Sequence, residues 1–250
     1  MKIFIVYKSH DPGHLEQRLR EKTDLTLIAY GDISKYPLDG YLYFSQGVLK
    51  LQLISVARMG PLFVSFNQLE RRAKDSLFQQ GLIKAVGIGK GKRPSIVDGT
   101  AGLGSDSFLM ASTGSTVSLF ERNSIIYELL SDGLRRYESK GANALGVLGR
   151  MHLEKRDFLK CDDLKASHEV VYLDPMFPIT KKNSLSKKPM HYLQTILREE
   201  TDEFEMISLA RQIATKRIVV KRGIQSPPLA GQDADITYRG SSSRFDVYLL

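Results

Sequence analysis

The stretch Asp174-Pro175-Met176-Phe177-Pro178 has the composition of a rigid loop at the end of a strand. It follows the apolar run Val170-Val171-Tyr172-Leu173, and its two prolines fix φ at two positions, which stiffens the exit from the strand. A carboxylate and a carbonyl held there can accept hydrogen bonds from a planar exocyclic amine, and Phe177 can stack on the ring that carries this amine. An amine held about 3 Å from an electrophilic methyl group reacts by in-line displacement, without a metal or a covalent intermediate. Taken alone, the stretch equally fits a proline-stiffened loop with a buried Phe.

A glycine-rich turn, residues 98–104 (Asp-Gly-Thr-Ala-Gly-Leu-Gly), separates a β-type run from a helical one. Gly99 and Gly102 would let the backbone approach a ligand without a Cβ in the way. The amides at the start of the next helix suit an anionic group, such as the carboxylate of a methionine moiety, and Asp98 could pair with its amino group. Any tight turn between a strand and a helix can use glycine, so the turn alone indicates only a possible ligand site.

Glu121 ends the next apolar run, about twenty residues beyond the glycine turn. A carboxylate at that position can accept hydrogen bonds from the two vicinal hydroxyls of a ribose. The alternative is a surface ion pair with Arg122, which would contribute little energy. Asp157 and Phe158 fit a third contact, a carboxylate for the amine of adenine beside an aromatic ring for its face; Asp157 could equally cap a short helix, with Phe158 in the core.

A dinucleotide dehydrogenase would use the same kind of sheet, but the chain has no conventional G-x-G-x-x-G phosphate turn. The rigid Asp174 loop after the fourth strand disfavours a dehydrogenase further, because it suits methyl transfer to an amine from a donor such as S-adenosylmethionine.

The elements that must position these residues alternate between strand and helix from residue 95 onward. Such alternation predicts an α/β, Rossmann-like domain with a mostly parallel sheet, whose strand ends meet at one edge. Strands are predicted at 96–97, 117–120, 153–155, 170–173, 218–220 and 244–250, and helices at 107–111, 124–138, 190–197 and 203–214.

Residues 1–67 have a different pattern, with short β-type runs separated by turn formers, which predicts a small β-rich N-terminal lobe. Its predicted strands cover residues 2–7, 25–30, 41–44, 48–55 and 62–66. The apolar start of the chain is too short for a signal sequence and fits a strand better. We expect residues 68–250 to form the catalytic domain, led by a helix over residues 68–86.

The charge of the chain favours a polyanionic partner. The formal net charge is +8, and Lys and Arg gather in four local clusters instead of being spread evenly. One cluster, Lys181, Lys182, Lys187 and Lys188, directly follows the Asp174 loop, where it could neutralise RNA phosphates. A plainly solvated basic loop is the alternative.

A single cysteine, Cys161, excludes an intramolecular disulfide framework, and the five histidines show no metal-ligand spacing. No apolar run is long enough to span a bilayer. We therefore expect a cytoplasmic protein without a metal or a membrane partner; the sequence does not indicate its oligomeric state.

Several blocks together resemble the bacterial ribosomal RNA small-subunit methyltransferase J family. They are residues 98–104, 119–123, 171–178, 214–222 and 244–248, and the resemblance covers roughly residues 60–250. It implies a class I methyltransferase fold, S-adenosylmethionine as donor, and methylation of a guanine N2 in 16S ribosomal RNA. It implies cofactor contacts from Ser105, Asp106, Glu121, Arg122, Asp157, Phe158 and Asp174, and Ser105 stands where the family commonly has Arg.

Two other functions use the same features. An amino methyltransferase acting on another base or on a protein glutamine would need the same loop, and a non-catalytic ribosome assembly factor could keep the same fold. Identifying the modified nucleoside distinguishes a methyltransferase with another acceptor from one that acts on guanine. A test of cofactor binding distinguishes a non-catalytic assembly factor from an enzyme.

Overall fold

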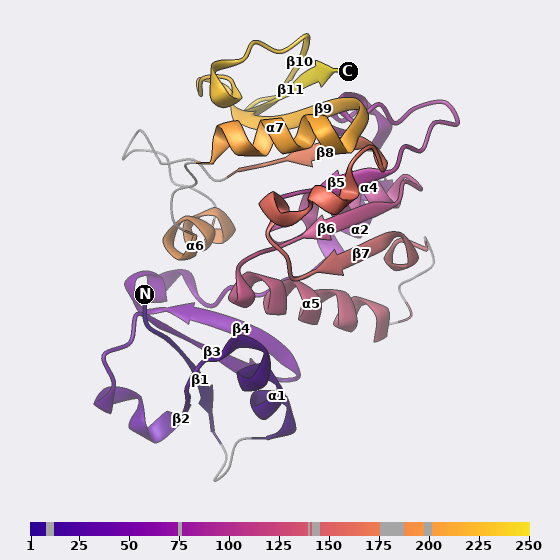
Figure 1. Cartoon of the computed structure of the whole chain (residues 1–250). Coiled ribbons are helices and arrows are strands. Elements are labelled where there is room, and N and C mark those ends of the chain that lie inside the picture. The colour runs from indigo at the N-terminus through magenta and orange to yellow at the C-terminus, as the bar shows by residue number, and fades with distance from the viewer. Residues whose placement is uncertain (9–12, 75–76, 140, 142–145, 176–187, 198–201) are drawn as a thin grey trace.

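The computed structural model consists of two sheets, a larger one and a smaller N-terminal one (Figure 1). It describes residues 1–8, 13–74, 77–139, 141, 146–175, 188–197 and 202–250. The larger sheet has seven strands in the order β10-β11-β9-β8-β5-β6-β7, and the smaller has four in the order β2-β1-β3-β4.

The five strands β5 to β9 of the larger sheet run parallel, as the strand–helix alternation predicts, and β10 and β11 add antiparallel strands at one edge. The α/β, Rossmann-like fold class is therefore confirmed. The strands are β5 (Ile96–Asp98), β6 (Val117–Phe120), β7 (Met151–Glu154), β8 (His168–Leu173), β9 (Ala214–Gly223), β10 (Ile236–Arg239) and β11 (Ser243–Leu249).

Helices cover both faces of this sheet. On one face, α7 (Glu203–Ile213) packs over β8 and β9 in a core that includes Val171 and Ile218 (Figure 1). On the other face, α4 (Ser105–Ser112) and α5 (Ser124–Ser139) belong to a second core. Two buried faces explain why the central strands carry runs of consecutive apolar residues, such as Val170–Leu173 of β8 and Ile218–Val220 of β9.

The N-terminal sheet shares this second core. Its strands are β1 (Ile3–Tyr7), β2 (Leu27–Ala29), β3 (Gly40–Ser45) and β4 (Val48–Leu53), and α1 (His14–Thr23) covers the face that carries Ile5 and Leu42. Apolar contacts continue from that face to α5, so one core joins both sheets.

A set of ring contacts fastens the segment after β4 to the larger sheet. Phe66 stacks on Phe108 of α4 with ring centroids 4.8 Å apart, and the edge of Tyr137 from α5 meets both rings. Gly133 of α5 lies against Val64, where a Cβ would approach the valine to 2.4 Å.

Four details of the predicted elements are wrong. Helix α1 was not predicted in the N-terminal lobe, and no strand was predicted where β10 lies. Residues 62–66 are not a regular strand, because Leu62 makes only an isolated bridge to Leu51. The single helix expected over residues 68–86 is divided into α2 (Asn67–Lys74), a short 3-10 turn (Leu77–Gln79) and α3 (Gly81–Ala85).

The chain continues from the Asp174 loop into α6 (Lys188–Ile196), which lies between the two sheets (Figure 1). Among the described residues, none of the helices is both long and apolar enough to span a bilayer.

Candidate methyltransferase active site

The candidate site lies at the carboxyl edge of the parallel strands, at the point where the strand order changes direction. From β5 the chain goes to β6 and β7 on one side, and then returns to β8 and β9 on the other. Open α/β sheets bind ligands at such a switch point. Asp98 pairs with Leu119 and Tyr172 in the neighbouring strands, so Glu121 and Asp174 each follow two residues beyond the same level. The three strand ends chosen from the sequence therefore meet at one edge.

The glycine turn is fastened to both neighbouring strands. The Gly99 amide donates to the Tyr172 carbonyl at 3.0 Å, and the Ala101 amide donates to the Phe120 carbonyl at 3.0 Å. A Cβ on Gly99 would lie 2.7 Å from the Phe158 ring, which explains the need for glycine there. Gly104, the N-cap residue directly before α4, has a φ of +73°, in the left-handed region that favours glycine.

Asp98 is buried beneath this turn, with 1% of its surface exposed. Its carboxylate accepts a hydrogen bond from the Thr100 amide at 3.1 Å and another from the Ser107 hydroxyl. Burial raises the pKa of Asp98 to about 7, although both hydrogen bonds lower it. The carboxyl group therefore holds the turn to the first part of α4, and its pairing with a cofactor amino group stays a prediction.

Glu121 connects the second strand end to the same turn. One carboxylate oxygen accepts from the Gly102 amide at 3.0 Å and the other from the Asn123 amide at 2.7 Å. A carboxylate offers about four acceptor positions, so it can also accept hydrogen bonds from ribose hydroxyls.

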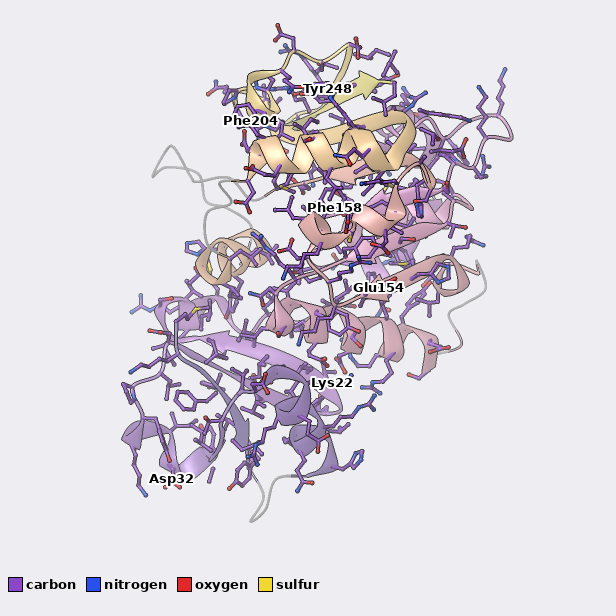
Figure 2. The ribbon with its side chains drawn as sticks, viewed as in Figure 1. Lys22, Asp32, Glu154, Phe158, Phe204 and Tyr248 are labelled. Carbon is purple, nitrogen blue, oxygen red and sulfur yellow. The ribbon has the colours of Figure 1, made fainter. Side chains whose placement is uncertain are left out.

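Arg122 forms ion pairs with Asp157 at 3.8 Å and with Asp202 at 3.5 Å. Asp157 also caps a short 3-10 turn by accepting from the Leu159 amide at 3.1 Å. Phe158 is buried against the larger sheet (Figure 2). These contacts match the structural alternative for Asp157 and Phe158, and their contact with adenine stays a prediction.

Asp174 is held in place through both its backbone and its side chain. Its amide donates to the Thr100 hydroxyl at 2.6 Å, which joins the end of β8 to the glycine turn. One carboxylate oxygen accepts from the Lys221 ammonium at 2.9 Å, and its side chain is 31% exposed.

The same ammonium joins Asp174 to α4. Lys221 also donates to Asp106 at 2.8 Å, and the Tyr172 hydroxyl donates to the same Asp106 oxygen at 2.6 Å. Asp106, Tyr172, Asp174 and Lys221 thus form one hydrogen-bonded group, which we call the Lys221 network.

The electrostatics of this network follow from one cation between two carboxylates. Burial lowers the pKa of Lys221, but Asp174 and Asp106 raise it by more, so the ammonium stays charged. Burial raises the pKa of Asp174, Lys221 lowers it, and Asp106 raises it again, leaving it above the usual range. The result is a partly exposed carboxylate whose proton affinity is increased.

Sequence reasoning did not identify Thr100, Tyr172 or Lys221 as site residues. Lys221 had a detectable signal, since it directly follows the apolar run Ile218-Val219-Val220. Leu173 pairs with Val220, so the next residues lie side by side, Asp174 just after the end of β8 and Lys221 within β9.

The structure describes some of the other predicted site residues but not all of them. Ser105 is exposed at the first position of α4, and Pro175 is buried directly after Asp174. Phe177, Lys181, Lys182 and Lys187 lie outside the described residues, as does the side chain of Lys188 at the start of α6.

Comparison with known proteins identifies the family. A relative from Thioalkalivibrio sulfidiphilus, named ribosomal RNA small subunit methyltransferase J, is 37% identical over 254 residues, covering 99% of this chain and 98% of the relative. The chain belongs to the ribosomal RNA small subunit methyltransferase J family. A second member, from Coxiella burnetii, is 38% identical over 212 residues, covering 84% of this chain and 83% of its own.

Two further comparisons agree with membership of the methyltransferase J family. The family model for SAM-dependent methyltransferases matches residues 33–250. The crystal structure of a SAM-dependent methyltransferase from Neisseria gonorrhoeae superposes with a TM-score of 0.74 at 29% identity, covering 99% of this chain and 95% of that one. The protein is therefore an S-adenosylmethionine-dependent methyltransferase, and the predicted family and cofactor are confirmed.

The residues at the carboxyl edge fit this cofactor. Gly102 has a φ of +54°, and a Cβ placed on it would meet no atom closer than 3.8 Å, so its backbone is open to a ligand. The acceptor groups of Glu121 and Asp106 lie on either side of that turn, where they suit ribose hydroxyls and an amino group.

Proposed function

We propose that this protein transfers a methyl group from S-adenosylmethionine to the exocyclic N2 amine of a guanine in 16S ribosomal RNA. The observation that carries the proposal is the position of Asp174. Asp174 stands at the switch point of the sheet, where its backbone amide bonds Thr100 of the glycine turn and its carboxylate is joined to α4 through Lys221. The family supplies the identity of the RNA, since its members are named for the small-subunit ribosomal RNA.

We assign contacts with the cofactor to ten residues: Asp98, Gly99, Gly102, Ser105, Asp106, Glu121, Arg122, Asp157, Phe158 and Asp174. Glu121 would hold the ribose, and the start of α4 with Asp106 would hold the methionine moiety. When bound, S-adenosylmethionine supplies an electrophilic methyl group on a positively charged sulfur.

Asp174 and Pro175 would hold the guanine. The Asp174 carboxylate and the carbonyl of Pro175 would accept hydrogen bonds from the two N2 hydrogens, with Phe177 stacking on the base. This orientation directs the nitrogen lone pair out of the plane of the base, toward the methyl group.

Asp174 also suits the proton that N2 must lose as it gains the methyl group. A carboxylate whose pKa is raised by burial is a better proton acceptor than one in water, and Lys221 keeps it ionised before the reaction. The fixed ammonium thus sets the protonation state of Asp174 and the orientation of its carboxylate.

For the remainder of the chain, we propose the division made from the sequence, a lobe of residues 1–67 and a catalytic domain of residues 68–250. We assign Lys181, Lys182, Lys187 and Lys188 to RNA phosphates, and place the reaction in the cytoplasm, where ribosomal subunits are assembled.

Mass spectrometry of 16S ribosomal RNA nucleosides from a strain lacking the gene tests this function. We expect loss of one N2-methylguanosine and its return when the wild-type gene is supplied, but not when the gene carries Asp174→Ala. Unchanged N2-methylguanosine, or loss of a different methylated nucleoside, would contradict the proposed acceptor. Calorimetry on the purified protein separates the non-catalytic alternative, which would show no affinity for S-adenosylmethionine.

A further inference from the structure

One face of the N-terminal sheet carries aromatic side chains that the methyl-transfer site does not use. Phe4 pairs with Tyr41 in the sheet register, and Tyr43 lies two residues farther along β3, so all three project from the face opposite Ile5 and Leu42. The rings of Tyr41 and Tyr43 have centroids 5.5 Å apart.

The aromatic surface extends past both edges of these strands. Tyr36 contacts Phe4 with ring centroids 5.5 Å apart. Tyr30 lies close enough to Tyr41 to raise the pKa of the Tyr41 phenol by charge interaction, in addition to the effect of burial. Beyond β4, the bridge between Leu51 and Leu62 places Phe63 beside Lys50, on the same side as Tyr43. We call Phe4, Tyr30, Tyr36, Tyr41, Tyr43 and Phe63 the aromatic face.

These rings are accessible. Tyr30 is 54% exposed, Phe63 is 44% and Tyr36 is 42%, while Phe4, Tyr41 and Tyr43 are partly buried between them. Large apolar side chains gathered on one exposed surface mark a binding site more often than isolated ones do.

Lysines are interleaved with the rings. The Lys8 ammonium lies 5.2 Å from the centroid of the Tyr30 ring, and the Lys50 ammonium lies 5.9 Å from that of Phe63. Burial raises the pKa of Tyr41 and of Tyr43, so these phenols stay uncharged and do not repel an anion. Rings for bases beside cations for phosphates are the pattern of a surface for single-stranded nucleic acid.

The aromatic face is connected by hydrogen bonds to α6, the first described element after Asp174 and Pro175. Gln52 lies across from Tyr41 on β4, and its amide donates to the hydroxyl of Tyr192 on α6 at 3.2 Å. The Tyr192 hydroxyl donates to the Gly60 carbonyl at 2.8 Å. Helix α6 is the first described element after Asp174 and Pro175, so an RNA strand that leaves the active site along α6 would reach these rings.

We infer that the aromatic face binds unpaired bases of the substrate RNA, and so positions the RNA for methylation at Asp174. This inference rests on the proposed function for the identity of the RNA. The bases would stack on Tyr30, Tyr36 and Phe63, while Lys8 and Lys50 contact the phosphates between them.

The test measures binding of a fluorescein-labelled single-stranded oligoribonucleotide and of the same sequence as a duplex, by fluorescence anisotropy. We expect Tyr30→Ala, Tyr36→Ala and Phe63→Ala each to weaken binding of the single strand about tenfold, and to leave duplex binding unchanged. Tyr30→Phe and Tyr36→Phe keep the rings and should bind the single strand as the wild type does.

Phe204→Ala is the matched control for loss of an exposed ring. Phe204 is 66% exposed on α7, far from Asp32 of the N-terminal lobe (Figure 2), and its loss should change nothing. With 16S ribosomal RNA as substrate, the three alanine variants should raise KM with kcat and S-adenosylmethionine affinity unchanged, because the face is distant from the reacting atoms.

Alanine variants that bind the single strand as tightly as the wild type would overturn the inference. If they did so but methylated assembled 30S subunits poorly, the face would bind a ribosomal protein instead, which also overturns it. Failure of the wild type to methylate any ribosomal RNA would contradict the proposed function, whereas the loss of single-strand binding in the variants would still be measurable.

Discussion

The carboxyl edge of the seven-stranded sheet and the aromatic face of the N-terminal sheet use opposite physical strategies. At the edge, charged groups are held in pairs by buried hydrogen bonds, as in the contacts of Lys221 with Asp106 and Asp174. On the aromatic face, the rings of Tyr30, Tyr36 and Phe63 are exposed, and neighbouring rings contact one another, as Tyr41 and Tyr43 do. A reaction needs fixed charges at one position, whereas binding of a flexible strand needs only apolar area and nearby cations.

This difference implies that substitutions in the two regions should affect different constants. Changes at the carboxyl edge should lower kcat or cofactor affinity and alter pH dependence, while changes on the aromatic face should alter RNA affinity and its dependence on salt. Five substitutions test this division.

Asp174→Ala should have the largest effect, lowering kcat about 10³-fold, because it removes the group that orients the amine and accepts its proton. S-adenosylmethionine affinity should fall by much less. Single-turnover methylation of 16S ribosomal RNA and calorimetry measure the two quantities. A variant that methylates normally would show that Asp174 does not act on the acceptor.

Asp98→Asn should alter the pH dependence of stability. The folded-state pKa of Asp98 is about 7 and its ordinary value is 3.8, so the folded protein keeps a proton that the unfolded chain loses in this interval. The contribution of Asp98 to stability therefore falls as pH rises from about 4 to about 7, by up to about 4 kcal/mol. Urea denaturation across this range should show a smaller decline for Asp98→Asn, whose amide can still bond Thr100 and Ser107. Parallel curves for the two proteins would refute a raised pKa.

Lys221→Met should lower kcat about 10²-fold and move the acidic limb of the kcat–pH profile to higher pH. Without the ammonium, Asp106 and burial both favour the protonated form of Asp174, so ionisation requires more alkaline solution. Lys216→Met is the matched control on the same strand, because Lys216 pairs with Glu169 near the opposite end of β9. An unshifted profile would remove Lys221 from control of Asp174.

Glu121→Gln should weaken S-adenosylmethionine binding about tenfold, because an amide has one acceptor oxygen and must serve both the Gly102 and Asn123 amides. Calorimetry measures the affinity. Glu154→Gln is the control, since Glu154 ends the neighbouring strand β7 and is exposed (Figure 2). Equal affinities in Glu121→Gln and wild type would place the ribose elsewhere.

Lys50→Gln should have the smallest effect, a loss of affinity of a few-fold for single-stranded RNA. The slope of log affinity against log salt should fall by about 0.7, the value expected for one phosphate contact on a single strand. Lys165→Gln, at an exposed position of the larger domain, should leave the slope unchanged. If both variants behaved alike, the charge on the aromatic face would have no special role.

The part of the site that depends on strand order was predictable from the sequence. Asp98, Glu121 and Asp174 each follow an apolar run, and parallel strands bring such positions to one edge whatever the details of packing. The Lys221 network depends additionally on the pairing of β8 with β9, which a single apolar run does not reveal.

Elements with weak periodicity were the ones that sequence reasoning missed. Helix α1 has only two leucines, and it buries Leu19 while Leu15 stays exposed, so its apolar stripe is too narrow to detect. Residues 62–66 do alternate between buried and exposed side chains, as a strand would, but beyond Leu62 they pack on helices instead of pairing with a strand.

The core shared by the two sheets has a consequence for how this enzyme could choose its target. Val64 and Phe66 are packed against α4 and α5, so the segment that follows the N-terminal sheet is fastened to the larger sheet. The spacing between the aromatic face and Asp174 is therefore set by the protein and not by the RNA. If RNA is bound at both places, the length of RNA between them is fixed. The methylated guanine would then be the one at a fixed number of nucleotides from the bases on the aromatic face.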